Sequence, residues 1–227
     1  MNGPGDDAHV RELVTRLRRL DCCAVSDALD RLGLSGVVTG LPQQSGQGRI
    51  AGRVITVKLG VGDPPPGPPR HLGTRAVEAA APGDVIVVEQ RTGINAGSWG
   101  GLLSLGAKMR GVAGVVVDGP VRDIDEAVAY DFPVWTHSLT AFTARGRVVE
   151  QGTNVPVTIG TVTVAPGDYV IADRSAVIFI AAAGMEQVLG VAETIVARES
   201  AMARALLDGA AISAVMGGNY EHMLKEI

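Results

Sequence analysis

The chain has 227 residues and a formal net charge of −4 at pH 7, with 46% hydrophobic and 19% charged residues. No stretch reaches the roughly 18 consecutive apolar residues of a membrane-spanning helix, and the first residues contain no apolar signal core. Its basic residues are dispersed, which excludes the clustered charge of a nucleic-acid surface. We therefore expect a cytoplasmic protein that binds neither membranes nor nucleic acid.

Glycine and cysteine usage add two further expectations. The 30 glycines are about twice the average share of roughly 7%, which predicts many tight turns or close backbone approaches. The two cysteines, Cys22 and Cys23, are adjacent, and neighbouring residues rarely reach the geometry of a disulfide. We expect both thiols to be reduced and mainly structural.

The first third of the chain alternates helix and strand signals. Apolar residues at helical spacing predict an amphipathic helix over 9–20, and Ser26 is expected to cap a second helix that ends before Gly33. The patterns over 50–59 and 84–89 predict strands, the second buried on both faces.

Between these strands lies a proline-rich segment, Pro64 to Pro69, which is expected to form a stiff surface loop. It is either a simple connector or a wall over a site. Arg70, His71 and Arg75 follow it and are either surface charges or contacts for an anionic substrate.

The centre and the C-terminal part predict a parallel α/β rhythm. We expect a helix over 102–109, a buried strand over 112–117, a loop over 118–122 and a helix from Asp123. Strands are expected over 134–136, 155–164, 168–172 and 176–180, with a turn at Pro166-Gly167. A helix over 186–207 stops at Gly209, and a tail ends in residues 220–227. No linker or internal repeat divides the chain, so we expect one α/β domain over 1–227 with a helical tail from about 186 to 227.

Several common sites are missing from this pattern. The sequence has no phosphate-binding glycine loop followed by Lys and Ser or Thr, and no Gly-x-Gly-x-x-Gly between a strand and a helix. The four histidines lie far apart, which weakens a zinc site, and His137 is more readily a packed or hydrogen-bonded histidine than a catalytic base.

The strongest chemical signal is the pair Arg122-Asp123, which follows a predicted buried strand at the place where open α/β folds bind ligands. An aspartate suits Mg²⁺ or Mn²⁺, and a guanidinium can hold a carboxylate or keto acid with two parallel bonds. The turn at Gly100 to Leu103 would add backbone amides and a favourable helix dipole. In the alternative interpretation, Asp123 only caps its helix and Arg122 pairs with Asp125 or Glu126.

These residues resemble a known family. Ser98 to Leu103 followed by Gly111 to Asp123 is similar to the family that contains 4-hydroxy-4-methyl-2-oxoglutarate aldolase and the regulator of ribonuclease activity A (RraA). Shorter segments over 25–29, 81–85, 154–157 and 166–168 resemble family segments in the same order. The resemblance implies a compact α/β/β/α sandwich that assembles as a homotrimer or homohexamer with active sites between subunits.

The resemblance also implies roles for individual residues. Asp123 would be the ligand of a divalent metal, Mg²⁺ or Mn²⁺, and Arg122 would bind the keto and carboxylate oxygens of a small 2-oxo acid. The amides of Gly100, Gly101, Leu102 and Leu103 would cradle the carboxylate. The implied reaction is retro-aldol cleavage of a 4-hydroxy-2-oxo acid to release pyruvate, with decarboxylation of oxaloacetate at the same site.

Position 101 departs from the aldolase pattern. The aldolases usually carry an acid upstream of the Arg-Asp pair where this chain has Gly101, which implies an incomplete outer shell around the metal. The resemblance also implies a glutamate from a neighbouring subunit, for which Glu199 is the first candidate and Glu193 the second. The alternative function is that of a non-enzymatic RraA-like protein that binds a partner and regulates ribonuclease activity.

Overall fold

The computed structural model describes residues 4–217, which begin with two helices, α1 (Pro4–Leu17) and α2 (Cys22–Leu32). The predicted start of the second helix at Ser26 is wrong. Asp21 is the N-cap, and its Oδ1 accepts a hydrogen bond from the Ala24 amide at 2.8 Å. The predicted stop is confirmed, because Gly33 takes the left-handed conformation that ends many helices.

One sheet forms the centre of the molecule, in the order β1-β11-β10-β3-β4-β5-β6-β2, with β7 paired to β3. Strands β3 to β6 run parallel to one another, whereas β10 pairs antiparallel with β3, β11 with β10 and β1 with β11. Strands β8 and β9 form a separate hairpin. The strand bounds are β1 (Val37–Val38), β2 (Gln43–Ser45), β3 (Ile50–Gly60), β4 (Val85–Glu89), β5 (Gly114–Val121), β6 (Val134–Leu139), β7 (Val149–Thr153), β8 (Val157–Ile159), β9 (Val162–Val164), β10 (Tyr169–Ala172) and β11 (Val177–Ile180).

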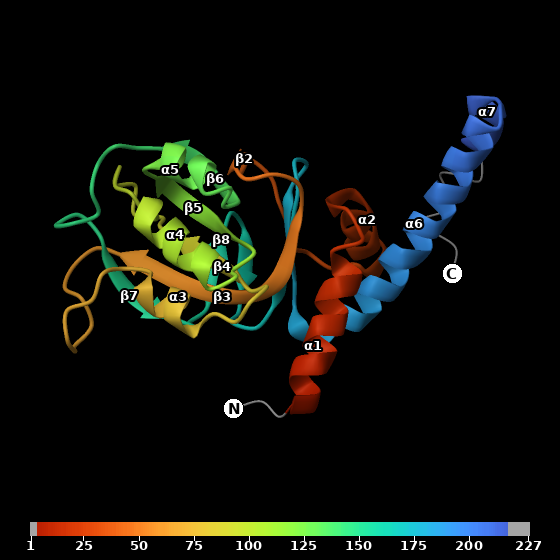
Figure 1. Cartoon of the computed structure of the whole chain (residues 1–227). Helices are drawn as coiled ribbons and strands as arrows, with labels where there is room; N and C mark the ends of the chain where they lie inside the picture. The colour runs from red at the N-terminus through yellow and green to blue at the C-terminus, as the bar shows by residue number, and fades with distance from the viewer. Residues whose placement is uncertain (1–3, 218–227) are drawn as a thin grey trace.

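Helices cover both outer faces of this sheet, which curls so that its two ends pack against each other (Figure 1). On one side lie α3 (Thr74–Ala79), α4 (Gly101–Met109) and α5 (Ile124–Ala129), and on the other lie α1, α2 and α6 (Met185–Leu207). A 3-10 turn (Ala182–Gly184) precedes α6, and α7 (Ile212–Val215) follows it.

Alternation along the strands explains the layers. In β4, Ile86 faces the α3 to α5 side while Val87 faces the space between the sheet halves. In β11, Ile178 packs against α1, α2 and α6 while Phe179 faces inward. Strands β4 and β11 therefore each contribute side chains to two apolar cores, one under a helical layer and one between the sheet halves, and the expected α/β/β/α sandwich is confirmed.

Several predicted boundaries are wrong. The strand expected over 112–117 continues as β5 through Pro120 to Val121, so most of the expected loop over 118–122 is strand. The strand expected over 155–164 is the hairpin of β8 and β9, which reverses near Gly160. Helix α3 and the strands β1, β2 and β7 were not predicted, because they are short and most of their residues are partly exposed, which weakens their hydrophobic pattern.

Other expectations are confirmed. The proline-rich segment forms an exposed loop without helix or strand, and the predicted C-terminal helix is α6. Cys22 and Cys23 are both free thiols. The predicted tail over 220–227 lies outside the described residues. Within 4–217, no helix is both long enough and apolar enough to span a membrane.

Candidate functional site

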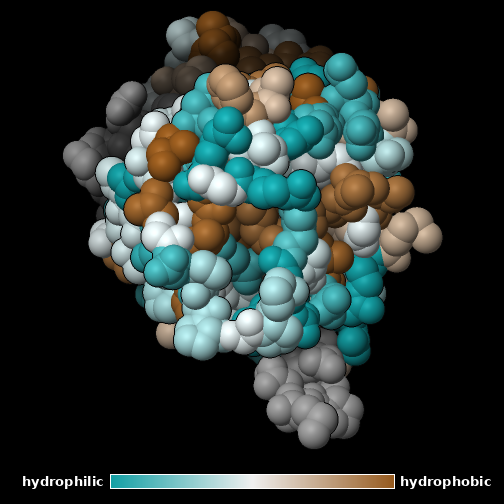
Figure 2. Space-filling model, turned by 90° about the vertical axis from the view of Figure 1, so that its left-hand side faces the viewer, coloured by the Kyte–Doolittle hydropathy of each residue, from teal (hydrophilic) through white to brown (hydrophobic). Residues whose placement is uncertain are grey.

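The candidate site forms where strand β5 ends beside the start of helix α4. Trp99 bridges to Val121 in parallel fashion, and the Arg122 amide donates to the Trp99 carbonyl at 3.0 Å. These contacts place Arg122 and Asp123 next to the first turn of α4. The site therefore lies at the carboxyl edge of the parallel strands, the face that Figure 2 presents, where apolar and polar side chains intermingle.

Asp123 has an unusual backbone conformation that directs its side chain. Its φ of 55° and ψ of 39° are left-handed, which Asp tolerates better than most residues. Although Asp123 is the N-cap of α5, its side chain makes no capping hydrogen bond to that helix. Its Oδ2 instead accepts a hydrogen bond from the Gly101 amide at 3.3 Å. The carboxylate therefore points across to α4.

Arg122 is held by the same carboxylate. Its Nε donates to Asp123 Oδ1 at 3.1 Å, and both side chains are about one-third exposed. The Arg122 side chain fits only because position 97 is glycine, since a Cβ there would lie 2.8 Å from Arg122 Cδ. Within the described chain, the terminal nitrogens of Arg122 have no hydrogen-bond partner, so they are available for a ligand.

These contacts contradict the alternative in which Asp123 is only a helix cap. Asp123 caps nothing with its side chain, and Arg122 pairs with Asp123 and not with Asp125 or Glu126. The hydrogen bond between the Gly101 amide and Asp123 also changes the predicted amide cradle. The Gly101 amide is directed to Asp123, which leaves the amides of Leu102 and Leu103, in the first turn of α4, without acceptors inside the helix.

Sequence reasoning gave no catalytic role to Glu126. This residue lies in the first turn of α5, and its carboxylate fills the space beside Gly101. A Cβ built on Gly101 would lie 2.5 Å from Glu126 Cδ. The spacing of three residues between Asp123 and Glu126 was a usable signal, because both fall near one face of a helix start.

The donor set fits a hard divalent cation better than zinc. An ionised carboxylate has about four lone-pair positions, and Asp123 uses two of them. Mg²⁺ keeps several waters and needs one or two carboxylates. Over residues 4–217 there is no group of three or more His, Cys, Asp or Glu side chains that could hold a metal, which is the arrangement a closed zinc site requires.

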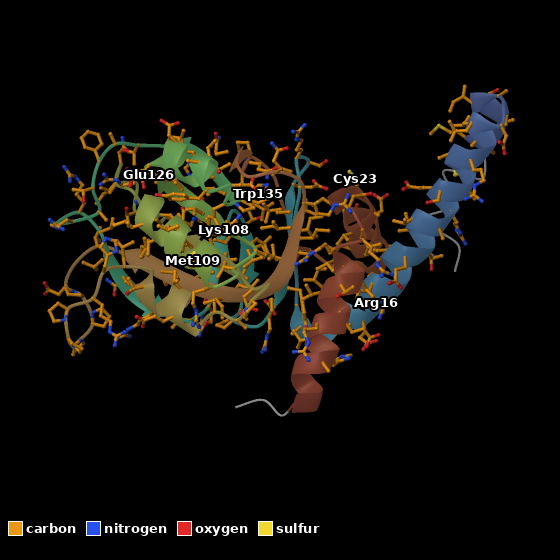
Figure 3. All side chains as sticks on the ribbon, in the orientation of Figure 1. Arg16, Cys23, Lys108, Met109, Glu126 and Trp135 are labelled. Atoms are coloured by element: carbon orange, nitrogen blue, oxygen red, sulfur yellow. The ribbon has the colours of Figure 1, made fainter. Side chains whose placement is uncertain are left out.

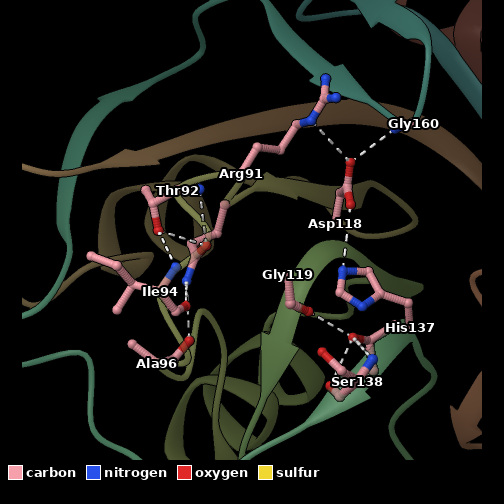
Figure 4. A network of polar contacts seen from close by, with 11 residues as sticks. Arg91, Thr92, Ile94, Ala96, Asp118, Gly119, His137, Ser138 and Gly160 are labelled. Carbon is pink, nitrogen blue, oxygen red and sulfur yellow. Dashed lines mark hydrogen bonds and ion pairs between the residues drawn. The ribbon is translucent and has the colours of Figure 1, made fainter.

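A cavity of about 450 Å³ lies at the same strand edge and is lined in part by Pro120, two residues before Arg122. Asp118 lies on its wall, 3.6 Å from His137 Nε2 and 3.8 Å from Arg91 Nε (Figure 4). Asp118 Oδ2 also accepts a hydrogen bond from the Gly160 amide nitrogen at 2.9 Å. His137, which lies on β6, is thus an exposed partner of Asp118 and not a packed histidine.

The remaining candidates lie elsewhere in this chain. Glu199 is on α6, in the helical layer opposite α4 and α5, where burial and repulsion from Asp21 and Asp27 raise its pKa. Glu193 forms a two-bond ion pair with Arg16 of α1. In the segment after the proline loop, Arg70 pairs with Glu78, and the exposed His71 contacts the Leu72 carbonyl.

Comparison with known proteins identifies the family. The family model described as RraA-like, Aldolase/RraA, matches residues 22–179. The chain belongs to the RraA-like family. A relative from Halalkalibacterium halodurans, named "Putative 4-hydroxy-4-methyl-2-oxoglutarate aldolase", is 31% identical over 198 residues, which cover 87% of this chain and 90% of the relative.

Solved structures confirm the fold. An uncharacterized protein from Pseudomonas syringae pv. tomato superposes with a TM-score of 0.81 at 24% identity, covering 91% of this chain and 98% of its own. RraAS2 of Streptomyces coelicolor, described as an unusual member of the RNase ES inhibitor RraA protein family, superposes with a TM-score of 0.67 at 24% identity. That likeness covers 87% of this chain and 93% of RraAS2.

Proposed function

We propose that this chain is a divalent-metal-dependent carbon–carbon lyase that cleaves a 4-hydroxy-2-oxo acid and releases pyruvate. The observation that carries the proposal is the convergence of Arg122, Asp123 and the first turn of α4 at one partly exposed point. Membership in a family with relatives named as aldolases supports the same reaction class.

Each residue has a chemical task in this proposal. The terminal nitrogens of Arg122 would bind the keto oxygen and one carboxylate oxygen of the substrate, and the Leu102 and Leu103 amides would bind the other carboxylate oxygen. Asp123 would hold Mg²⁺ or Mn²⁺. A cation bound there supplies Lewis-acid polarisation of oxygen and a lowered pKa for water.

Arg122 would then act on the charge that develops during cleavage. As the bond between C3 and C4 breaks, the 4-hydroxyl group would lose its proton to solvent and C4 would become the carbonyl of the second product. The electron pair of the broken bond would form the enolate of pyruvate, with negative charge on the keto oxygen that Arg122 would bind, and a proton from solvent at C3 would complete pyruvate. Because this negative charge is larger in the transition state than in the substrate, the guanidinium stabilises the transition state more. Decarboxylation of oxaloacetate places charge on the same oxygen, so we propose it as a second activity.

The test is a coupled assay of pyruvate release from 4-hydroxy-2-oxo acids and oxaloacetate, with Mg²⁺ and then with chelator. The matched variant is Asp123→Asn, since Asn also tolerates the left-handed backbone. We expect chelation to abolish turnover and the variant to lose about 100-fold or more in kcat/KM, as when one transition-state group is removed. A turnover rate that neither the chelator nor Asp123→Asn changes would contradict the proposal.

The alternative is a non-catalytic regulator that binds a partner protein. The observation that favours it is exposed apolar surface on α4, where the Leu102 side chain is 83% exposed and that of Met109 is 79% exposed. The same assay separates the two functions. A regulator releases no pyruvate from any substrate, and Leu102→Ser would weaken its partner binding without affecting Mn²⁺ binding.

We also propose assembly into a homotrimer or homohexamer. The outer half of α6 and α7 projects away from the body of the molecule (Figure 1) and exposes Leu207 and Ile212. A second copy would cover this surface and would allow Glu199 to approach the neighbouring site. Light scattering of the protein eluted from a size-exclusion column measures its molar mass and so the number of copies in the assembly.

A further inference from the structure

The space beside Gly101 contains the carboxylate of another residue. A Cβ built on Gly101 would lie 2.5 Å from Glu126 Cδ and 3.0 Å from Glu126 Cβ, and it would overlap Glu126 Oε2. Gly101 itself is buried, and Glu126 comes from α5, which packs on α4 (Figure 3). Any side chain at position 101 would therefore compete with Glu126 for one place.

Two carboxylates converge on the same pair of glycines. The Gly101 amide donates to Asp123 Oδ2, and a Cβ on Gly100 would lie 3.0 Å from that same oxygen. One guanidinium, from Arg122, balances only one of the two negative charges. The excess negative charge of the Asp123 and Glu126 carboxylates favours the binding of a cation between them and solvent.

The helix dipole alone does not explain this position. Asp125 and Glu126 both lie in the first turn of α5, where acids are favourable toward the helix dipole. That effect is similar for the two residues, yet it is Glu126 that covers Gly101. Within residues 4–217 the Glu126 carboxylate has no hydrogen-bond or ion-pair partner that would hold it there for another reason.

We propose that Glu126 is a positioning residue that supplies the outer carboxylate of the cation site beside Asp123, in place of a side chain at position 101. Its carboxylate would orient water on the cation, and Gly101 is required because it leaves room for Glu126. This inference rests on the proposed function, and it replaces the expectation that Gly101 leaves the outer shell incomplete.

The test measures Mn²⁺ binding to the full chain by the paramagnetic resonance signal of free Mn²⁺, which needs no turnover. Removing an outer-shell partner commonly costs about 10–100-fold in metal affinity, so Glu126→Gln is expected to weaken Mn²⁺ binding about tenfold. Gly101→Ala is expected to weaken it similarly, because its Cβ displaces the Glu126 carboxylate. Asp125→Asn is the matched control, with the same charge change in the same helical turn, and is expected to stay within about twofold.

The double variant Gly101→Ala with Glu126→Gln decides whether the two positions act together. If Gly101→Ala acts through Glu126, the double variant binds Mn²⁺ no more weakly than Glu126→Gln alone. Full additivity would overturn the inference, as would equal affinities for Glu126→Gln and Asp125→Asn. Because Glu126→Gln leaves Gly101 in place, it remains informative even if Gly101→Ala fails to fold.

The outcomes also separate this inference from the proposed function. If wild type binds Mn²⁺ and Asp123→Asn does not, while Glu126→Gln matches wild type, the inference fails and the proposed function stands. If wild type and Asp123→Asn fail alike to bind Mn²⁺, the proposed metal dependence fails together with the inference. Thermal unfolding of each variant in chelator controls for loss of fold.

Discussion

At the scale of single residues, the backbone of Asp123 decides what its side chain can do. An aspartate at a helix start ordinarily accepts hydrogen bonds from its own helix. The left-handed conformation costs on the order of 1–3 kcal/mol and turns the carboxylate away from α5, toward the Gly101 amide. A local strain thus brings an acid from one element to the amide end of another.

Two buried serines near the site give a prediction at the same scale. Ser98 and Ser104 are each 1% exposed, but Ser104 accepts from Trp99 Nε1 at 3.0 Å and donates to the Gly100 carbonyl, whereas the Ser98 hydroxyl has no partner among the described residues. We expect Ser104→Ala to lower the free energy of unfolding by about 1–2 kcal/mol, because it leaves the Trp99 donor unpaired.

Ser98→Ala is the matched control for this prediction. It removes a hydroxyl that makes no hydrogen bond, so the free energy of unfolding is expected to stay within about 0.5 kcal/mol or to rise. Urea denaturation of both variants measures the difference. Equal losses would show that an unseen partner, such as a buried water, satisfies Ser98.

At the scale of elements, strand β5 delivers the Arg-Asp pair because it is longer than its apolar run. Asp118, Gly119 and Pro120 carry turn signals, yet the strand passes through them with a register shift against β6 between Val117 and Pro120. Proline is accepted at such irregular positions, where no ladder donor is required. Gly119 is needed because a Cβ there would lie 2.7 Å from Gln90 Cβ.

Acidic side chains of the parallel strands hold the β8-β9 hairpin, which allows a prediction at the scale of elements. Glu89 Oε2 accepts the Thr158 amide at 2.6 Å, and Glu89 is 8% exposed. We expect Glu89→Ala to lower the free energy of unfolding by about 2 kcal/mol, since the partly buried Thr158 amide loses its acceptor.

Glu78→Ala is the control for the hairpin prediction. Glu78 pairs with Arg70 at the surface, and such exposed pairs contribute about 0–1 kcal/mol. Chemical denaturation of the two variants compares them directly. A Glu89 variant no less stable than the Glu78 variant would show that the hairpin does not depend on the Glu89 contact.

At the scale of the whole molecule, the outer helical layer joins helix α1 to helix α6. Arg16 of α1 donates to both carboxylate oxygens of Glu193 on α6, each at 2.8 Å. The hydrogen bond from Arg16 lowers the pKa of Glu193. The contribution of this pair to stability is therefore present above the ordinary glutamate pKa of about 4.3 and is lost as the pH falls through the lowered folded value.

This linkage predicts a pH-dependent difference between wild type and Arg16→Met. Wild type is expected to have the higher Tm at pH 6, and the gap is expected to narrow below about pH 4 as Glu193 becomes protonated. Arg11→Met, on the same helix, controls for the loss of a positive charge and is expected to show no such narrowing. Calorimetry over this range measures both, and a gap independent of pH would contradict the assignment.

The sequence by itself determined the family and the α/β rhythm, and it singled out the Arg122-Asp123 pair as the candidate site, because the apolar run before the pair and the glycines at 100 and 101 are local signals. It could not show that Glu126 fills the space at Gly101, or that the Gly101 amide binds Asp123. Both facts depend on the approach of α4 to α5, which follows from the pairing of Trp99 with Val121. The tertiary structure decided these because contacts between elements distant in sequence leave no periodic pattern along the chain.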